Sequence, residues 1–466
     1  MWTTKIARDI PPVPQRSHPN PLRRDLSASV ADGAAFSLMV GSGETYVPAF
    51  VLALGLGQVK SGLTATLPML FGAILQMATP ILIHRVGSHR RWVILCAIVQ
   101  AMSFVPLCVA AWTGWASWTL VVVAASFYWG TGLAAGPAWN TWMARLVRRS
   151  IRAPFFARRT RLCQAAVLLG LVAAGGLLQW SAARSAALTG FAVIFTIACL
   201  SRMISAGFIW RQRELRLDPR SLDERVSLKS FIGRFGKTEG RLLAYMFFVQ
   251  AATHLAAPYF TPFMLKQLHH SYATYVSLLA AAFMAKIMTL PAAGRLAHRM
   301  GARRLLWIGG VGIVPLAFLW SLSSSVPYLL FLQLLGGVAW GCYELATFLL
   351  LFETIPDKER TGVLTVFNLV NASAIAGGSL VGGWMLQRWG ADTSAYLLVF
   401  GVSSAARGLT LPLLTRVADV PPAPEWFDLR SLTVRPSAGS IDRPVLSTIP
   451  ESVATSAQDD VGKDAR

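Results

Sequence analysis

Long apolar stretches, separated by shorter charged segments, run through most of this sequence. Each stretch is close to the ~20 residues that an α-helix needs to cross ~30 Å of hydrocarbon. Because lipid offers the backbone no hydrogen-bond partners, we expect helices and not an open sheet. The pattern predicts twelve membrane-spanning helices, at about 33–57, 62–83, 91–113, 117–144, 162–183, 187–210, 241–265, 272–296, 304–324, 327–352, 362–387 and 394–415.

The predicted spans fall into two sets of six, on either side of a charged segment. The expected fold class is therefore an all-α membrane protein made of two six-helix bundles. The expected units are a disordered basic cytoplasmic arm at 1–32, an N-terminal bundle at 33–210, a cytoplasmic linker at 211–240, a C-terminal bundle at 241–416 and a disordered cytoplasmic tail at 417–466. The arm and the tail are polar and contain many prolines, a composition that leaves little apolar surface to bury.

One short basic motif occurs twice, at equivalent places in the two halves. His84-Arg85-Val86-Gly87 and His298-Arg299-Met300-Gly301 lie 214 residues apart, and an arginine pair follows each. Tyr46-Val47-Pro48 and Phe260-Thr261-Pro262 repeat at the same spacing. Several matches in the same order indicate a duplicated unit, so we expect a pseudo-two-fold relation between the bundles.

The distribution of charge predicts a membrane orientation and argues against nucleic-acid binding. The formal net charge is +21, but only 14% of the residues are charged while 54% are hydrophobic. Lys and Arg are concentrated in the loops after spans 2, 4, 8 and 10. Positive loops stay in the cytoplasm, so we expect an inner-membrane protein with both termini and the linker on the cytoplasmic side. Membrane lipids are the expected partners of these loops, and no nucleic-acid partner is expected.

The sequence offers no pattern for an enzyme, a metal site or a cofactor. The cysteines lie within apolar stretches, without a Cys-x-x-Cys pair or a grouping with histidine: Cys96, Cys108, Cys163, Cys199 and Cys342. Such cysteines pack as small apolar side chains. A phosphate-binding Gly-x-x-x-x-Gly-Lys-Ser/Thr loop is also absent from the sequence, so ATP-driven transport is not expected.

The repeated motif, the six-plus-six arrangement and the long linker resemble the major facilitator superfamily of secondary transporters. The loop pattern of that family is Gly-x-x-x-Asp-Arg-x-Gly-Arg-Arg/Lys. The residues that fit it are Gly294, Arg299, Gly301 and Arg303, and more loosely Arg85, Gly87 and Arg90. His84 and His298 stand where the family usually has Asp. The resemblance implies that these residues form cytoplasmic gate loops, together with Arg152 and Arg360. The stretch 136–159 is similar to the loop after the fourth span in uncharacterised bacterial members.

The family resemblance also implies that the bundles rock about a central cavity lined by spans 1, 4, 7 and 10. A charge at the centre of a membrane helix costs about 2.5–3.5 kcal/mol on insertion scales, so a buried ionisable residue needs a reason. The candidates are Glu44 in span 1, His254 in span 7, Lys286 in span 8 and Glu344 in span 10. We expect Glu44 or Glu344 to bind the coupling proton. The alternatives are a packing ion pair between Lys286 and Glu344, and a hydrogen-bonded helix contact for His254.

Polar and aromatic residues near these groups are candidates for the wall of the substrate cavity, because aromatic rings combine apolar area with a polar group. They are Tyr46, Tyr128, Trp129, Trp139, Asn140, Gln250, Asn368 and Asn371. Arg202 and Arg407 occupy matched positions in spans 6 and 12. We expect their side chains to extend toward the lipid headgroups while pairing with helix-end carbonyls, and not to bind substrate.

These observations predict a secondary transporter that moves an unidentified small solute, coupled to protons, by alternating access, and that acts as a monomer. An alternative is a non-transporting membrane assembly factor or sensor with the same bundles. A second alternative is a drug or metabolite exporter. Exporters of the family often have a Gly-Pro-x-x-Gly-Gly pattern in span 5, and Gly175-Gly176 has no such proline.

Overall fold

The computed structural model describes residues 21–147, 149–214, 238–354 and 360–417, and all regular elements in these residues are helical. Eleven segments are long and apolar enough to cross a membrane. The remaining expected span, the seventh, is divided into short pieces, and its longest helix has 17 residues. The prediction of an all-helical membrane protein is therefore confirmed.

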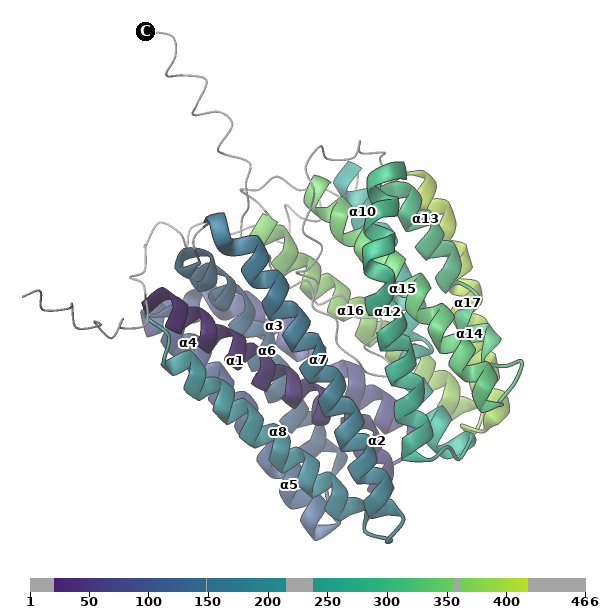
Figure 1. The fold of residues 1–466 in the computed structure, drawn as a ribbon. Coiled ribbons are helices and arrows are strands. Elements are labelled where there is room, and N and C mark those ends of the chain that lie inside the picture. The colour runs from purple at the N-terminus through teal and green to yellow at the C-terminus, as the bar shows by residue number, and fades with distance from the viewer. Residues whose placement is uncertain (1–20, 148, 215–237, 355–359, 418–466) are drawn as a thin grey trace, which may run out of the picture.

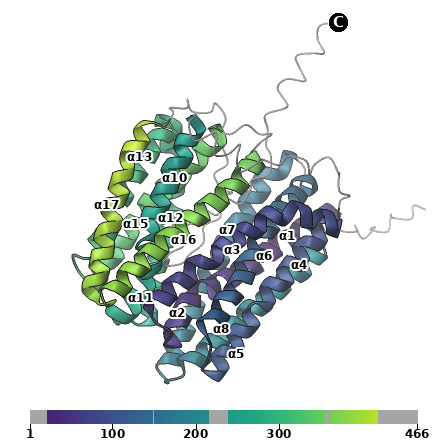
Figure 2. The same cartoon turned by 180° about the vertical axis from the view of Figure 1, so that it is seen from behind.

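Two groups of helices lie side by side (Figures 1 and 2). The N-terminal bundle contains α1 (Pro21–Ser42), η1 (Glu44–Tyr46), α2 (Val47–Ala53), α3 (Gln58–Val86), α4 (His89–Met102), α5 (Phe104–Thr113), α6 (Trp118–Leu146), α7 (Arg149–Ala182) and α8 (Ala187–Trp210). The C-terminal bundle contains α10 (Thr238–His254), η3 (Ala257–Tyr259), α11 (Phe260–Pro262), η4 (Phe263–Gln267), α12 (Tyr272–Met300), α13 (Ala302–Ile313), α14 (Leu316–Leu319), α15 (Val326–Thr354), α16 (Arg360–Arg388) and α17 (Thr393–Thr415).

Helix breaks occur at equivalent places in the two bundles. The first span is interrupted between α1 and α2, and the seventh between α10 and α11. The third span divides into α4 and α5, and the ninth into α13 and α14. Proline lacks the N–H that continues a helix, and Pro48, Pro258 and Pro315 lie at or beside three of these breaks. The duplication seen in the sequence therefore extends to the irregularities of the fold.

Two helices begin earlier than the sequence predicts. The helix of the first span starts at Pro21 and not at 33, so residues 21–32 belong to α1 and not to a disordered arm. Asp25 and Asp32 in this stretch are buried, because partners from α7, α8 and the residues after α8 satisfy their carboxylates. Similarly, α7 starts at Arg149, within the loop predicted before position 162. Residues 1–20, 215–237 and 418–466 of the expected arm, linker and tail lie outside the described residues.

The bundles meet at the end that lies opposite the repeated basic loops, where α2 and α11 are close together (Figure 2). There the side-chain oxygen of Gln58 accepts hydrogen bonds from Gln267 Nε2 (3.1 Å) and from the Tyr396 hydroxyl (2.7 Å). The side-chain oxygen of Gln179 accepts one from the backbone N–H of Ala273 (3.2 Å). We call Gln58, Gln267 and Tyr396 the clasp, because they join the bundles at this end.

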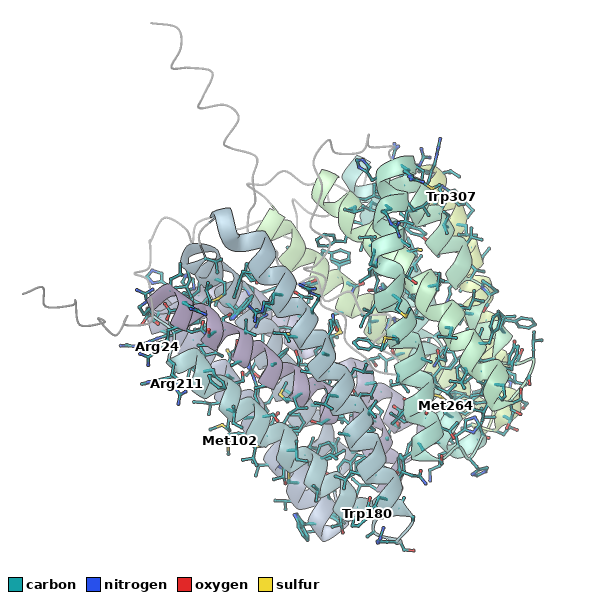
Figure 3. The ribbon with its side chains drawn as sticks, viewed as in Figure 1. Arg24, Met102, Trp180, Arg211, Met264 and Trp307 are labelled. Carbon is teal, nitrogen blue, oxygen red and sulfur yellow. The ribbon has the colours of Figure 1, made fainter. Side chains whose placement is uncertain are left out.

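The ends of the N-terminal bundle differ in chemistry. Arg24 and Arg211 lie at one end and Trp180 at the other (Figure 3). The start of α1 and the end of α17 lie at the same end of the molecule as these arginines (Figure 1). The clasp is therefore remote from the end at which the described chain begins and finishes.

Candidate functional site

Glu44 lies at the break in the first span. Gly43 and η1 separate α1 from α2. An added Cβ at Gly43 would lie 2.6 Å from the Ala198 side chain, so glycine permits the close approach of α8. The Glu44 side chain is buried, with 8% of its surface exposed. Its Oε2 accepts a hydrogen bond of 2.6 Å from the Tyr128 hydroxyl of α6. A hydroxyl donor of this kind stabilises a carboxylate that is removed from water.

A small cavity adjoins the Glu44 carboxyl. Its volume is about 30 Å³, and its lining includes Glu44, Thr64, Ser103, Tyr128 and Trp129. The rest of the lining is apolar, and a cavity of this size has room for about one water molecule. All its lining residues come from the N-terminal bundle. Glu44 therefore faces a space within its own bundle, which differs from the position between the bundles that the family resemblance implied.

Lys286 and Glu344 form an ion pair between α12 and α15. Lys286 Nζ donates to Glu344 Oε1, and the two side chains are 2% and 7% exposed. A buried charge without a partner would be very unfavourable, and each residue supplies the partner of the other. The packing ion pair considered from the sequence is therefore present in this conformation.

His254 lies in the last turn of α10 and is fully buried. Its Nδ1 is 2.9 Å from the carbonyl oxygen of Gln250. Arg407 of α17 donates to the carbonyl of Thr253 (3.5 Å) and to that of Ile313 (2.9 Å), so it contacts the ends of α10 and α13. The hydrogen bond of His254 to Gln250 lies within α10, and a role of His254 in proton transfer stays a prediction.

The expected substrate-wall residues are dispersed. The Tyr46 hydroxyl donates to the Leu171 carbonyl (2.5 Å), and Asn368 of α16 donates to Gln76 of α3 across the two bundles (3.3 Å). Trp129 lines the Glu44 cavity, and Trp139 stacks against Arg159. Asn140, Gln250 and Asn371 are buried. The side-chain oxygen of Asn371 has no hydrogen-bond partner among the residues that the structure describes.

The expected gate loops make their described contacts within each bundle. Arg90, in the first turn of α4, donates to the carbonyls of Trp210 (3.3 Å) and Gln212 (3.0 Å) at the end of α8. Arg303, in the first turn of α13, donates to the carbonyl of Thr415 at the end of α17 (2.9 Å). Arg90 and Arg303, each the first arginine of the pair that follows the repeated motif, therefore have equivalent partners in the two bundles.

The other residues of these loops are mostly exposed. They are His84, Arg85, Gly87, His298 and Arg299, whereas Gly294 is half-buried and Gly301 buried. Gly87 and Gly301 adopt positive φ values of 68° and 86°, which only glycine adopts without strain. Arg152 and Arg360 lie in α7 and α16, and their side chains are outside the described residues.

Sequence analysis missed a buried polar cluster in the N-terminal bundle. Arg202 and Arg407 are only 4% and 3% exposed, so the expectation that their side chains extend to the headgroups is wrong. Arg407 does bond helix-end carbonyls, whereas Arg202 lies in this cluster. Arg202 donates to Gln100 Oε1 (2.8 Å) and Ser205 Oγ (2.6 Å), and Ser205 donates to Asp32 (2.6 Å). The spacing of Asp25, Ser29 and Asp32 is that of one helix face, and this periodicity could have identified the start of α1.

Comparison with known proteins points to one family of transporters. The sequence model of the Major Facilitator Superfamily matches residues 242–438. A curated relative, the tetracenomycin C resistance and export protein of Streptomyces glaucescens, is 25% identical over 174 residues, which cover 37% of this chain and 32% of that protein. The match thus spans about a third of the length of the curated relative.

Several solved structures share the fold. A variant of the nucleoside transporter NupG superposes with a TM-score of 0.66 at 10% identity, over 84% of this chain and 99% of that one. A bacterial homologue of the human lysosomal transporter Spinster, inward-facing and unoccupied, gives 0.61 at 14% identity, over 86% and 96%. The transporter FucP, in the outward conformation, gives 0.55 at 13% identity, over 86% and 100%. At these identities the likeness concerns the fold.

Proposed function

The chain belongs to the Major Facilitator Superfamily, and from this premise we propose that it moves a small solute across the inner membrane by alternating access, coupled to a proton on Glu44. As a membrane transporter, the chain is not an enzyme. The small-solute substrate, the coupling to protons and the orientation in the membrane all belong to the proposal. The observation that carries it is the Glu44 carboxylate, buried at a helix break, hydrogen-bonded to the Tyr128 hydroxyl and adjoining a cavity that can hold water.

The chemistry of this site supports a role in proton exchange. A negatively charged Glu44 gains from the Tyr128 hydroxyl, whereas a neutral Glu44 costs less to bury in the low-dielectric interior of a membrane. The charged side chain is therefore stabilised beside the Tyr128 hydroxyl, and the neutral side chain is more easily buried without a partner. The interruption between α1 and α2 lets the two halves of the first span move separately when the charge changes. We propose that protonation of Glu44 shifts the balance between two arrangements of the bundles.

We also propose that the end with the repeated basic loops faces the cytoplasm. The last turns of α3 and α12 carry exposed arginines, Arg85 and Arg299, and positive segments are retained on the cytoplasmic side. Both termini would then be cytoplasmic, and the clasp would close the outer end. In this interpretation the structure represents a state closed to the outside.

The test begins with identification of a ligand. A thermal-shift screen of purified protein against a metabolite panel at two pH values would reveal ligands, because binding to the folded state raises its melting temperature. The hit is then assayed in proteoliposomes with and without an imposed pH gradient. We expect Glu44→Gln to abolish the stimulation by the gradient, while binding and melting temperature stay within the range of the wild type.

The matched control is Glu344→Gln, which removes a carboxylate of similar burial that is paired with Lys286. Its effect should appear mainly as lost stability. Unchanged gradient-driven transport by Glu44→Gln would remove Glu44 from the proposed mechanism.

Export is a second candidate direction, favoured by the partial match to a resistance and export protein. Transport of the identified ligand in vesicles of known orientation distinguishes export from import. If no metabolite raises the melting temperature and the protein instead co-purifies with a membrane partner, the assembly factor or sensor becomes the better interpretation.

A further inference from the structure

A chain of buried polar contacts connects Tyr128 to a second carboxylate. Gln100 Nε2 in α4 donates to the backbone carbonyl of Tyr128 (3.2 Å), and Gln100 Oε1 accepts from Arg202 Nε of α8 (2.8 Å). Arg202 also donates to Ser205 Oγ (2.6 Å), whose hydroxyl donates to Asp32 Oδ1 of α1 (2.6 Å). Gln100, Arg202 and Asp32 are 1%, 4% and 3% exposed. Ordered polar networks of this kind make a membrane bundle rigid.

Two arginines of the network lie near the Asp32 carboxylate. Arg159 of α7 approaches Asp32 Oδ2 at 3.4 Å, and Arg202 reaches the same carboxylate through Ser205. Arg202 also lies over the ring of Phe36, with its guanidinium carbon 4.8 Å from the ring centre. Arg202 is therefore fixed from α1 and α8, and it fixes Gln100 in turn.

A glycine in α6 provides the space for the Gln100 amide. An added Cβ at Gly132 would lie 2.7 Å from Gln100 Nε2, which is closer than packed atoms approach. The atom that it would displace is the end of a flexible side chain, so an alanine there moves the amide without displacing a helix backbone. Gly136, one turn further along α6, has nothing within 4 Å of an added Cβ.

We infer that Gln100 and Arg202 are positioning residues for proton exchange at Glu44. They hold the backbone of α6 at Tyr128, so that the Tyr128 hydroxyl stays 2.6 Å from the Glu44 carboxylate. Among the residues that line the cavity beside Glu44, Tyr128 is the other titratable side chain. The inference rests on the proposed function and adds residues remote from the carboxyl to its machinery.

The repeat-matched arginine of the other bundle makes different contacts. Arg407 donates to the backbone carbonyls of Ile313 and Thr253, and these bonds join helix ends. Arg202 donates instead to two side chains, Gln100 and Ser205. The hydrogen-bonded connection from an arginine through Ser205 to the Asp32 carboxylate is thus a feature of the N-terminal bundle, which also contains Glu44.

The experiment is a pH titration followed by infrared difference spectroscopy, which detects the carbonyl stretch of a protonated carboxyl group. Purified full-length protein in lipid is titrated, and Glu44→Gln identifies the band that belongs to Glu44. We expect Gln100→Leu and Gly132→Ala to move the midpoint of this band toward that of Tyr128→Phe, because the carboxylate loses an aligned hydroxyl donor. Gly136→Ala should leave the midpoint unchanged.

A double variant separates positioning from an independent effect. Tyr128→Phe should move the midpoint by itself, and Gln100→Leu should add little further shift in that background. The inference is overturned if Tyr128→Phe shifts the midpoint while Gln100→Leu and Gly132→Ala do not, or if the shifts are fully additive. If Glu44→Gln removes no carboxyl band, the proposed function itself fails.

Discussion

Glu44 and Glu344 are carboxylates buried to nearly the same extent, 8% and 7% exposed, but they have different partners. Glu344 is paired with the ammonium group of Lys286, whereas Glu44 accepts from the neutral hydroxyl of Tyr128. A salt-bridged carboxylate that took up a proton would leave the charge of its buried partner uncompensated. A carboxylate opposite a hydroxyl can take up a proton without leaving a lysine uncompensated. At the scale of single residues, we therefore propose Glu44, and not Glu344, as the proton carrier.

The Lys286–Glu344 pair predicts that the effects of single and double mutations on stability are not additive. Removing one partner leaves a buried charge, so Lys286→Met should lower the free energy of unfolding by about 3–5 kcal/mol. The double variant Lys286→Met/Glu344→Gln should recover most of this loss, because no uncompensated charge remains. Chemical unfolding in detergent micelles measures both. A double variant no more stable than Lys286→Met would contradict a direct pair in the folded protein.

Single charges in apolar stretches were readable from the sequence, but their partners were only partly so. Glu44, Lys286 and Glu344 stand out because charge is rare inside a span, and the Lys286–Glu344 pair could be anticipated as an alternative. The bond from Tyr128 to Glu44 depends on the packing of α6 against the break in the first span, which periodicity does not encode. Asp32 was missed because residues 1–32 are polar and rich in proline, a composition typical of a disordered arm.

Helices in this molecule approach one another through particular glycines. In α16, an added Cβ at Gly378 would lie 2.3 Å from the carbonyl oxygen of Ala251, and at Gly382 2.0 Å from that of Leu255. Both contacts are with α10 or the residue that follows it. Gly377 has nothing within 4 Å. Close helix packing through small residues in α16 therefore belongs to particular faces of this helix.

This difference predicts which glycines of α16 tolerate alanine. Gly378→Ala and Gly382→Ala should each lower the free energy of unfolding by about 1–3 kcal/mol, because backbone atoms must move to admit a methyl group. Gly377→Ala, on the same helix, is the control and should not destabilise. Thermal unfolding of the three variants provides the comparison. Equal melting temperatures for all three would show that α10 and α16 are not packed this closely.

The loop between η4 and α12 predicts a pH effect outside the membrane-spanning segments. His270 lines a cavity of about 380 Å³ together with Lys266 and Gln179. Burial lowers the pKa of His270 from its usual 6.5. As the pH falls below 6.5, His270 therefore binds a proton in the unfolded chain before it does so in the folded protein. The contribution of neutral His270 to the free energy of unfolding is complete above pH 6.5, and it is lost as the pH falls toward the pKa of His270 in the folded protein.

His270→Gln should therefore flatten the fall in melting temperature on mild acidification. The neighbouring exposed His269 supplies the control, and His269→Gln should retain the slope of the wild type. Melting curves recorded at successive pH values test this. An unchanged slope in His270→Gln would assign the pH dependence to other groups.

At the scale of elements, the sequence predicted which helices exist and in what order, but it did not predict where they begin and end. Apolar length located the spans, because hydrophobic thickness fixes how many residues cross a bilayer. The early starts of α1 and α7 were not evident, because both helices continue through polar residues that other helices cover. The breaks at Glu44 and His254 interrupt continuous apolar stretches, and only the nearby prolines indicated them.

For the whole molecule, the clasp joins the bundles at one end. Gln58 comes from the N-terminal bundle, while Gln267 and Tyr396 come from the C-terminal bundle, so these bonds must break if the bundles separate there. Neutral hydrogen bonds contribute about 0.5–1.5 kcal/mol each, an amount that a change of charge at Glu44 can offset. The proposed switch therefore has a weak polar contact to open at one end.

The most direct measurement of this account is the distance between the two basic loops as a function of pH. Spin labels attached to Arg85→Cys and Arg299→Cys, both exposed, report it by electron–electron double resonance after the five native cysteines are replaced by alanine. We expect the distance distribution to shift with pH in the otherwise native protein, and to be the same at every pH when Glu44 is replaced by Gln. An identical pH-dependent shift in the Glu44→Gln protein would contradict the claim that a proton on Glu44 moves the bundles.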